Sequence, residues 1–273
     1  MKYTKISVFI PNVKPPFFIG SQLWGAFGYG FKKVVCINPS FKCDGCCATE
    51  NCIYYDFYER KNIYHKCRFD FKLNQDTYKY NLYLFNEATR ELPYILSAIH
   101  QTITKFGFGV ERKTYDFFTI KVNDKLVYDG ENFNIPENNV MEFINDDYKD
   151  DFILKIITPI RMKKDSKLAV DIDLEDMIRS IYHKELGLSS LDIKKLPFEV
   201  KAEIKKQLKW QKLSRYSNRQ NTKMKIDGVI GEMRIKNIDE KSYRYLKLGE
   251  IIGVGKLTTF GLGKIEIKDI EWK

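Results

Sequence analysis

One local pattern occurs twice in the chain, and this repeat limits the possible folds more than any other sequence feature. The segments "KFGFGVERKTYDFFTIKV" (105–122) and "TFGLGKIEIKDIEW" (259–272) both run from an aromatic residue through two spaced glycines and a charged stretch into a predicted strand. A predicted helix precedes each copy. A supersecondary unit that occurs twice indicates two domains of one fold, although glycine turns also resemble one another by chance.

The spacing of apolar residues predicts the order strand–helix–strand–strand–helix–strand in each half. This order is typical of an α+β chain with two tandem ferredoxin-like (RRM-like) domains. We place the N-terminal domain at 1–125 and the C-terminal domain, which ends in the glycine-rich loop, at 151–273. The Asn-, Asp- and Gly-rich stretch 126–150 is the predicted linker. "FEVKAEIKKQLKWQKL" (198–213) is predicted to form a basic helix.

The charge balance points to an anionic partner. The chain has 273 residues with 46 Lys and Arg against 36 Asp and Glu, a formal net charge of +10. Such an excess favours nucleic acid as the partner, although a merely basic protein has the same composition. No apolar run approaches the ~20 residues of a membrane span, and no signal peptide is recognisable. We therefore expect a cytoplasmic protein with no membrane partner and no disulfide-linked cysteines.

The stretch "GVGKLTTFGLGK" (253–264) looks at first like a phosphate-binding loop for a nucleotide. Thr258 occupies the position where both the P-loop and the dinucleotide motif require glycine, and a strand rather than a helix follows. Neither motif therefore fits. Successive backbone N–H groups of a glycine turn can still cradle phosphates of a nucleic-acid backbone. The residues predicted to contact RNA in this loop are Gly253, Gly255, Lys256, Gly261, Gly263 and Lys264.

Residues 200–225 form the most basic segment, with nine Lys or Arg and one Glu. Neutralising phosphates with such a segment would confer salt-dependent affinity. Trp210 and Tyr216 lie among the charges, where they could stack on unpaired bases. The alternative is a solvated helix whose lysine stems cover the core. The further residues predicted to bind RNA are Lys32, Lys33, Arg215, Arg219, Lys223 and Lys225.

Several segments together, in the correct order, resemble one family. "LKLGEIIGVGKLTTFGLGKIEI" is similar to the terminal glycine-rich signature of the RAMP superfamily, and specifically of CRISPR-associated endoribonucleases that process precursor crRNA. "LWGAFGYGFKKVVC", "CDGCCATENCIYYDFYE", "LYLFNEATRELPYILSAI", "ITPIRMKKDSKL" and "RYSNRQ" followed by "MKIDGVIGE" fit the same family. The resemblance covers most of the chain.

The resemblance implies two ferredoxin-like domains that bind CRISPR repeat RNA and cleave it without a metal. In that reaction the RNA's own 2′-hydroxyl attacks the adjacent phosphate, which leaves 5′-hydroxyl and 2′,3′-cyclic phosphate ends. Family members commonly place a catalytic histidine in or just after the first helix. This chain departs from that pattern, because its first helix offers Tyr29, Lys32 and Lys33 but no histidine.

The chemistry needs a base for the 2′-hydroxyl, an acid for the leaving oxygen and a cation for the phosphorane. Among the three histidines, His100 flanks an apolar helix face and His65 lies in a predicted loop, so His183 is the best catalytic candidate. A solvated surface histidine is the alternative for His183. Arg215 and Tyr216 of "RYSNRQ" are candidates for phosphorane stabilisation and proton transfer, or for binding the RNA strand without chemistry.

All six cysteines lie in the predicted insertion 36–67, five of them within the 17 residues 36–52, and Cys43 and Cys46 have metal-ligand spacing. Cys36, Cys43, Cys46 and Cys52 are the predicted ligands of a closed, structural zinc site, with an iron–sulfur cluster or simple reduced thiols as alternatives. Four thiolates leave no open position for substrate, so no cofactor is expected in catalysis.

These observations predict a metal-independent CRISPR precursor-crRNA endoribonuclease, with repeat RNA and other CRISPR effector subunits as partners. One alternative is a non-catalytic RAMP subunit that holds crRNA inside an effector complex, which the missing histidine favours. Another is a general single-stranded RNA-binding module.

Overall fold

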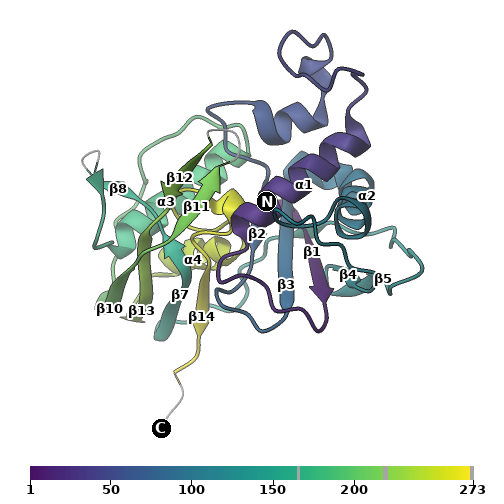
Figure 1. Cartoon of the computed structure of the whole chain (residues 1–273). Coiled ribbons are helices and arrows are strands. Elements are labelled where there is room, and N and C mark those ends of the chain that lie inside the picture. Colours follow the sequence, from purple (N-terminus) through teal and green to yellow (C-terminus); the bar gives the residue numbers. More distant parts are fainter. Residues whose placement is uncertain (165–166, 218–220, 271–273) are drawn as a thin grey trace. The chain divides into compact units, whose positions relative to one another are not determined.

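The computed structural model describes residues 1–164, 167–217 and 221–270. The chain forms two compact units, one made of Met1–Phe69 with Asn74–Glu142 and the other of Asp70–Leu73 with Phe143–Lys273. Each unit follows the predicted order strand–helix–strand–strand–helix–strand (Figure 1). The repeat seen in the sequence therefore reflects two copies of one fold.

The first unit is built on an antiparallel sheet in the order β2-β3-β1-β4-β5, and β6 pairs with one end of β1. Four neighbouring strands of this sheet, in the order β4-β1-β3-β2, have the order of a ferredoxin-like sheet. The part predicted as a linker, 126–150, contains most of β5 and all of β6. The elements are β1 (Lys2–Ile10), α1 (Gly20–Val35), η1 (Thr49–Asn51), η2 (Tyr55–Glu59), β2 (Cys67–Asp70), β3 (Tyr78–Phe85), η3 (Asn86–Glu91), α2 (Leu92–Gln101), η4 (Thr102–Phe106), β4 (Thr119–Val122), β5 (Lys125–Tyr128) and β6 (Met141–Glu142).

The core of this unit follows the predicted periodicities. β1 buries every second residue, including Ile6, Val8 and Ile10, while α1 buries Leu23, Phe27 and Phe31 at intervals of four. A strand and a helix with one apolar face each must cover those faces against one another. The α1 and α2 helices also contact each other.

The second unit has a four-stranded antiparallel sheet in the order β10-β13-β7-β14, which Figure 1 shows side by side. This is again the ferredoxin-like order, so the predicted fold class is confirmed. Two small hairpins, β8–β9 and β11–β12, are inserted between the main elements. The elements are β7 (Phe152–Ile160), β8 (Lys163–Lys164), β9 (Lys167–Leu168), α3 (Leu174–Leu188), β10 (Glu203–Gln211), β11 (Ser214–Ser217), β12 (Thr222–Lys225), β13 (Gly228–Lys236), α4 (Glu240–Ile252), η5 (Thr258–Phe260) and β14 (Ile265–Lys268). Within the described residues, none of the helices is sufficiently long and apolar to traverse a membrane.

The predicted basic helix at 198–213 is wrong, because most of this segment forms the edge strand β10. Lys, Gln and Glu favour helices on the surface, but pairing with β13 over nine residue positions overrides that preference. Ile204, Leu208 and Trp210 are half-buried, and exposed lysines occupy other positions of the strand. Lysines on an edge strand discourage pairing with another chain, which explains part of the charge without RNA.

Gly231 of β13 provides a test of this sheet. Its φ is +134°, and an added Cβ would lie 2.1 Å from the Gln207 carbonyl oxygen on β10. We expect Gly231→Ala to lower the free energy of unfolding by about 1–3 kcal/mol, because the alanine would be strained at this backbone angle and would clash with β10. The measurement is the urea midpoint. Gly25→Ala in α1, where nothing lies within 4 Å, is the control and should leave the midpoint unchanged or higher. Equal midpoints for the two variants would contradict this account of β13.

Candidate functional site

The glycine loop, residues 253–264, joins α4 to β14 in the second unit. Gly253, Gly255, Gly261 and Gly263 all have φ between 71° and 78°, which disfavours other residues. At Gly263 a Cβ would lie 1.9 Å from the Val254 carbonyl oxygen. The glycines are therefore required by the backbone path and by close approach within the loop.

The prediction that the amides of these four glycines are free to cradle phosphates is wrong. Each of the four N–H groups donates a hydrogen bond inside the protein: Gly253 to Gly249 O (2.9 Å), Gly255 to Ser180 Oγ (3.0 Å), Gly261 to Thr258 O (2.9 Å) and Gly263 to Pro159 O (3.0 Å). Gly253, Gly261 and Gly263 are also buried. The N–H groups of these four glycines are therefore not available to an anion.

Lys184, a buried lysine of α3, holds the glycine loop through hydrogen bonds. The side chain of Lys184 donates to the carbonyl oxygens of Ile252 (3.3 Å), Gly253 (2.8 Å) and Gly255 (3.3 Å), and to Thr258 Oγ1 (3.3 Å). Lys184 is only 6% exposed. One ammonium group thus ties the end of α4 to the glycine loop.

Sequence reasoning missed Lys184, although the chain carries a signal for it. Lys184 lies on the apolar face of α3 that Ile181 and Leu188 define, next to the predicted catalytic residue His183. A lysine on an apolar stripe needs hydrogen-bond partners when it is buried, so it indicates a structural or functional contact.

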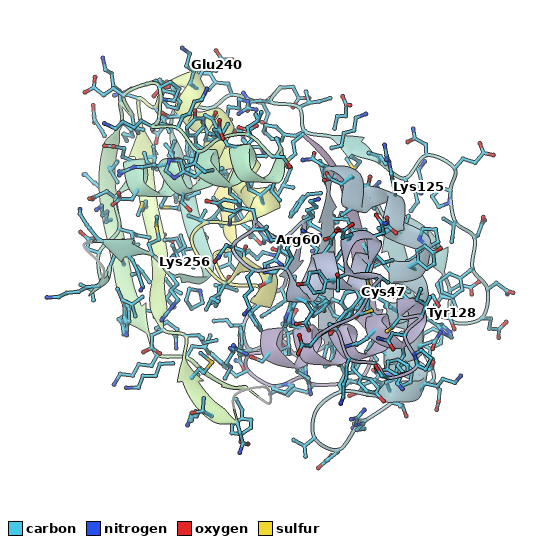
Figure 2. All side chains as sticks on the ribbon, turned by 90° about the horizontal axis from the view of Figure 1, so that it is seen from above. Cys47, Arg60, Lys125, Tyr128, Glu240 and Lys256 are labelled. Atoms are coloured by element: carbon cyan, nitrogen blue, oxygen red, sulfur yellow. The ribbon has the colours of Figure 1, made fainter. Side chains whose placement is uncertain are left out.

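Lys264 was predicted to bind RNA, but its charge is already paired. Its ammonium lies 2.9 Å from Asp70 Oδ2 and 3.6 Å from Glu266 Oε1, and its side chain is 12% exposed. The prediction is therefore corrected: Lys264 is a structural partner of Asp70. Lys256, by contrast, is exposed on the loop (Figure 2) and forms no ion pair within the described residues.

The hairpin β11–β12 extends the β10–β13 pair and has two different faces. Tyr216 pairs with Lys223 and Ser214 with Lys225, so the side chains of these four residues lie on one face. Lys223, Lys225 and Tyr216 are exposed. These three residues of the basic segment 200–225 therefore lie on one exposed face of a hairpin, and not on a helix. Arg219 lies outside the described residues.

Arg215 lies on the opposite face of this hairpin and contacts the glycine loop. Its guanidinium carbon is 4.4 Å from the centre of the Phe260 ring, and its Nη2 donates to Met224 Sδ at 3.4 Å. Burial lowers the pKa of Arg215. Its Nε is buried without a hydrogen-bond partner, and no carboxylate pairs with it among the described residues. Stacking thus orients a guanidinium that has unused donors.

The other two predicted catalytic residues, Tyr216 and His183, have partners different from those of Arg215. Tyr216 is 55% exposed, and its hydroxyl donates to Asn221 Oδ1 at the end of the hairpin. His183 lies on α3 with its ring against Tyr182, and its Nε2 is buried without a hydrogen-bond partner in the described part of the chain. The buried Nε2 of His183 is therefore not available to a substrate.

Lys32 and Lys33, the predicted RNA-binding lysines of α1 in the first unit, contact different groups. Lys32 donates to Cys43 Sγ at 3.2 Å and lies 4.7 Å from the Tyr54 ring centre. Lys33 is exposed and lies over Phe41 at 4.1 Å. Lys33 therefore has the freer charge of the two.

The predicted structural metal site is not supported. Over residues 1–164, 167–217 and 221–270, no three His, Cys, Asp or Glu side chains gather into a group that could hold a metal ion. The Cys36 thiol instead faces Asn38 O at 3.7 Å, and Cys43 accepts from Lys32. Neither a zinc ion nor an iron–sulfur cluster on Cys36, Cys43, Cys46 and Cys52 is supported by this geometry.

Aromatic packing holds part of the cysteine-rich segment to α1 in place of a metal. Tyr58 stacks on Trp24 with ring centres 4.2 Å apart, and its hydroxyl donates to Trp24 O at 3.1 Å. Phe57 packs against Phe31 at 5.3 Å. Rings of this size bury enough apolar surface to anchor the end of the segment.

Two family models match the chain in succession. Residues 4–140, about half of the chain, match the AF_1859_N model, described as an N-terminal domain, and residues 154–265 match the model of the CRISPR-associated endoribonuclease Cas6. An uncharacterized protein of Archaeoglobus fulgidus is 24% identical over 286 residues, covering 97% of this chain and 96% of that protein.

Solved structures of Cas6 proteins share the fold. A product complex of Cas6 TTHB231 is similar with a TM-score of 0.58, 13% identity and coverage of 98% of this chain and 99% of that one. Another structure of the same protein, from Thermus thermophilus, has a TM-score of 0.52, 11% identity and 98% coverage of both chains. The Cas6 TTHA0078 product complex has a TM-score of 0.54 and 12% identity, covering 98% and 100%.

The fold and the matched segments define a CRISPR-associated protein of the RAMP type, with two ferredoxin-like domains and a terminal glycine-rich loop. The chain belongs to the family of the AF_1859_N model, which matches half of it, and its residues 154–265 are similar to Cas6. The family predicted from the sequence is thereby confirmed.

Lys184 offers a test of how the loop is held. We expect Lys184→Met to lower the free energy of unfolding by about 1–3 kcal/mol, because the loop carbonyls lose a charged donor. Amide hydrogen exchange across 253–264 should also accelerate. The control is Lys241→Met on the exposed surface of α4, which should change neither quantity. Unchanged exchange in the Lys184 variant would show that the loop does not depend on this side chain.

Proposed function

We propose that the chain is a precursor-crRNA endoribonuclease that cuts within CRISPR repeat RNA without a metal. The observation that carries this proposal is the contact between Arg215 and Phe260, both within the residues that match the Cas6 model. It fixes a guanidinium with unused donors between a glycine loop and a basic hairpin. A guanidinium in that state suits a phosphate whose negative charge increases during reaction.

The proposed reaction is an internal transesterification. The 2′-oxygen bonds to the adjacent phosphorus, the bond from phosphorus to the 5′-oxygen breaks, and the products carry 2′,3′-cyclic phosphate and 5′-hydroxyl ends. One group must take the proton of the 2′-hydroxyl and another must supply a proton to the 5′-oxygen. Arg215 would stabilise the phosphorane, and Tyr216, whose side chain is exposed on the other face of the same hairpin, is the proposed proton-transfer group. His183 would act only through Nδ1.

RNA binding is assigned to side chains that are exposed and free of ion pairs within the described residues. These are Lys223 and Lys225 on the hairpin, Lys256 on the glycine loop and Lys33 on α1. Each can approach a phosphate without breaking an existing ion pair, so its full charge contributes to counterion release.

The test of catalysis is incubation of the protein with synthetic repeat RNA in EDTA. We expect one cut with a 2′,3′-cyclic phosphate end, detected by mass spectrometry, and no cut when the nucleotide 5′ of the scissile phosphate carries 2′-deoxyribose. Arg215→Ala should lower the rate by about 100-fold or more, because the phosphorane loses its cation. Tyr216→Phe tests the hydroxyl separately, and a rate equal to wild type would remove Tyr216 from the chemistry.

Matched variants make this experiment specific. Arg179→Ala on α3 removes an arginine that pairs with Glu175 and Asp176, and it should cut at the wild-type rate. His183→Ala should also cut normally if only the hairpin supplies chemistry. A cut that needs added divalent metal, or one that survives 2′-deoxy substitution, would refute the mechanism.

The hairpin lysines predict a measurable salt dependence. For single-stranded RNA, each lost phosphate contact lowers the slope of log K against log salt concentration by about 0.7. The double variant Lys223→Ala/Lys225→Ala should therefore show a slope shallower by up to about 1.4, with weaker binding at low salt. The matched control, Lys194→Ala/Lys195→Ala, removes two exposed lysines of the same unit and should keep the wild-type slope. Equal slopes for the two double variants would exclude the hairpin from the interface.

A non-catalytic crRNA-binding subunit is the second candidate function. It is favoured by the absence of histidine from α1 and by the burial of His183 Nε2. This function predicts tight binding of repeat RNA without a cut in the same EDTA experiment. Other CRISPR effector subunits would then be the expected partners.

A further inference from the structure

The first copy of the glycine repeat, which the proposed function does not use, borders a pocket in the first unit. The pocket has a volume of about 310 Å³, near the lower end of the range for small-ligand sites. Four segments form it: the stretch after β1, the start of α1, the start of β3, and the turn between η4 and β4. Its lining residues include Lys14, Gln22, Tyr78, Phe108, Lys113 and Tyr115.

The two copies of the repeat differ in what lies against them. In the second unit, Gly263 is buried and its amide is bonded to Pro159 O. The corresponding glycine of the first unit, Gly109, is exposed and borders the pocket. The glycine of the second unit is therefore buried against the rest of that unit, whereas the glycine of the first unit is exposed beside a pocket.

Backbone bonds give the turn of the pocket a defined shape. Phe108 and Lys113 exchange both backbone hydrogen bonds, at 2.9 and 3.0 Å, and the Tyr115 N–H donates to Ile103 O at 3.0 Å. Gly107 has a φ of +72°, and a Cβ there would lie 2.0 Å from the Arg112 carbonyl oxygen. The pocket is therefore preformed, which lowers the entropy lost when a ligand binds.

Three aromatic rings and one amide give the pocket its recognition groups. The ring centres of Tyr78, Phe108 and Tyr115 lie 5.3 to 6.4 Å apart. The Tyr78 hydroxyl donates to Gln22 Oε1 at 2.7 Å, and burial raises the pKa of Tyr78, so this hydroxyl stays protonated. Gln22 Nε2 donates no hydrogen bond within the described residues, so it is available to an acceptor on a ligand.

The charged groups at the pocket are two exposed lysines, Lys14 and Lys113, against one carboxylate, Glu111. This excess of positive charge favours an anion beside the aromatic rings. Aromatic rings, a free amide donor and lysines together match the base and phosphate of a nucleotide.

We propose that this pocket binds one unpaired nucleotide of the RNA. The base would pack against Tyr115, the polar edge of the base would accept a hydrogen bond from Gln22, and the phosphate would lie at Lys14 and Lys113. The inference rests on the proposed function, because the nucleotide belongs to the same repeat RNA. It adds a second contact region, on the first unit, that reads a single-stranded part of the repeat.

The test uses the full chain and repeat RNA that carries 2′-deoxyribose at the mapped cut. Tyr115→Leu should weaken binding by at least about fivefold, because base stacking on an aromatic ring is lost, while Tyr115→Phe should bind like wild type. Lys14→Ala/Lys113→Ala should make the salt slope shallower by about 0.7 for one lost phosphate contact. The control Lys121→Ala/Lys125→Ala removes two exposed lysines of the same unit outside the pocket (Lys125 is labelled in Figure 2) and should keep the slope.

Photocross-linking with 5-iodouridine-substituted repeat RNA supplies a direct readout. We expect cross-links in the peptide that contains Phe108 and Tyr115. If wild-type protein cuts or binds the repeat but the pocket variants match their controls and cross-links fall elsewhere, the pocket proposal fails and the proposed function stands. If wild-type protein ignores repeat RNA, both fail. If AMP prevents the cross-link to this peptide at concentrations that leave the RNA bound, the pocket is a site for a free nucleotide, and the proposal is overturned.

Discussion

The organisation of the candidate site depends on the buried ammonium of Lys184. Its hydrogen bonds to the end of α4 and to Thr258 hold the glycine loop in one conformation. That conformation places the Phe260 ring, and the ring in turn orients the Arg215 guanidinium of the neighbouring hairpin. A chain of contacts from one lysine thus fixes an arginine that has no carboxylate partner among the described residues, and an arginine in that state is suited to meet a phosphate.

The glycines of the loop are needed for their backbone conformation and small size, and not as a source of free N–H groups. They adopt positive φ angles and approach neighbouring carbonyl groups more closely than any side chain would allow, as at Gly263. Their N–H groups bond within the unit, so these four glycines satisfy their own donors. In the proposed function, phosphate recognition is therefore assigned to side chains around the loop, such as Lys256 and Arg215.

The same repeat has two different environments in the two units. In the second copy the Gly263 N–H is bonded to Pro159 O of β7, whereas the copy at 105–122 borders a pocket lined by aromatic and basic groups. Both copies begin with the same aromatic–glycine pattern, which sets the turn. The difference arises from what the rest of each unit places beside that turn, such as Gln22 at the start of α1.

The sequence by itself determined the two-domain fold and most helices and strands, because periodic burial of residues such as Leu23, Phe27 and Phe31 depends only on local spacing. It could not determine that 203–211 pairs as an edge strand, since lysine-rich spacing fits a helix equally well. Nor could it determine the state of each charge. Lys264 meets Asp70 from 194 positions away and Lys184 meets Gly253 from 69, so only the tertiary structure decided which lysines are buried partners and which remain free.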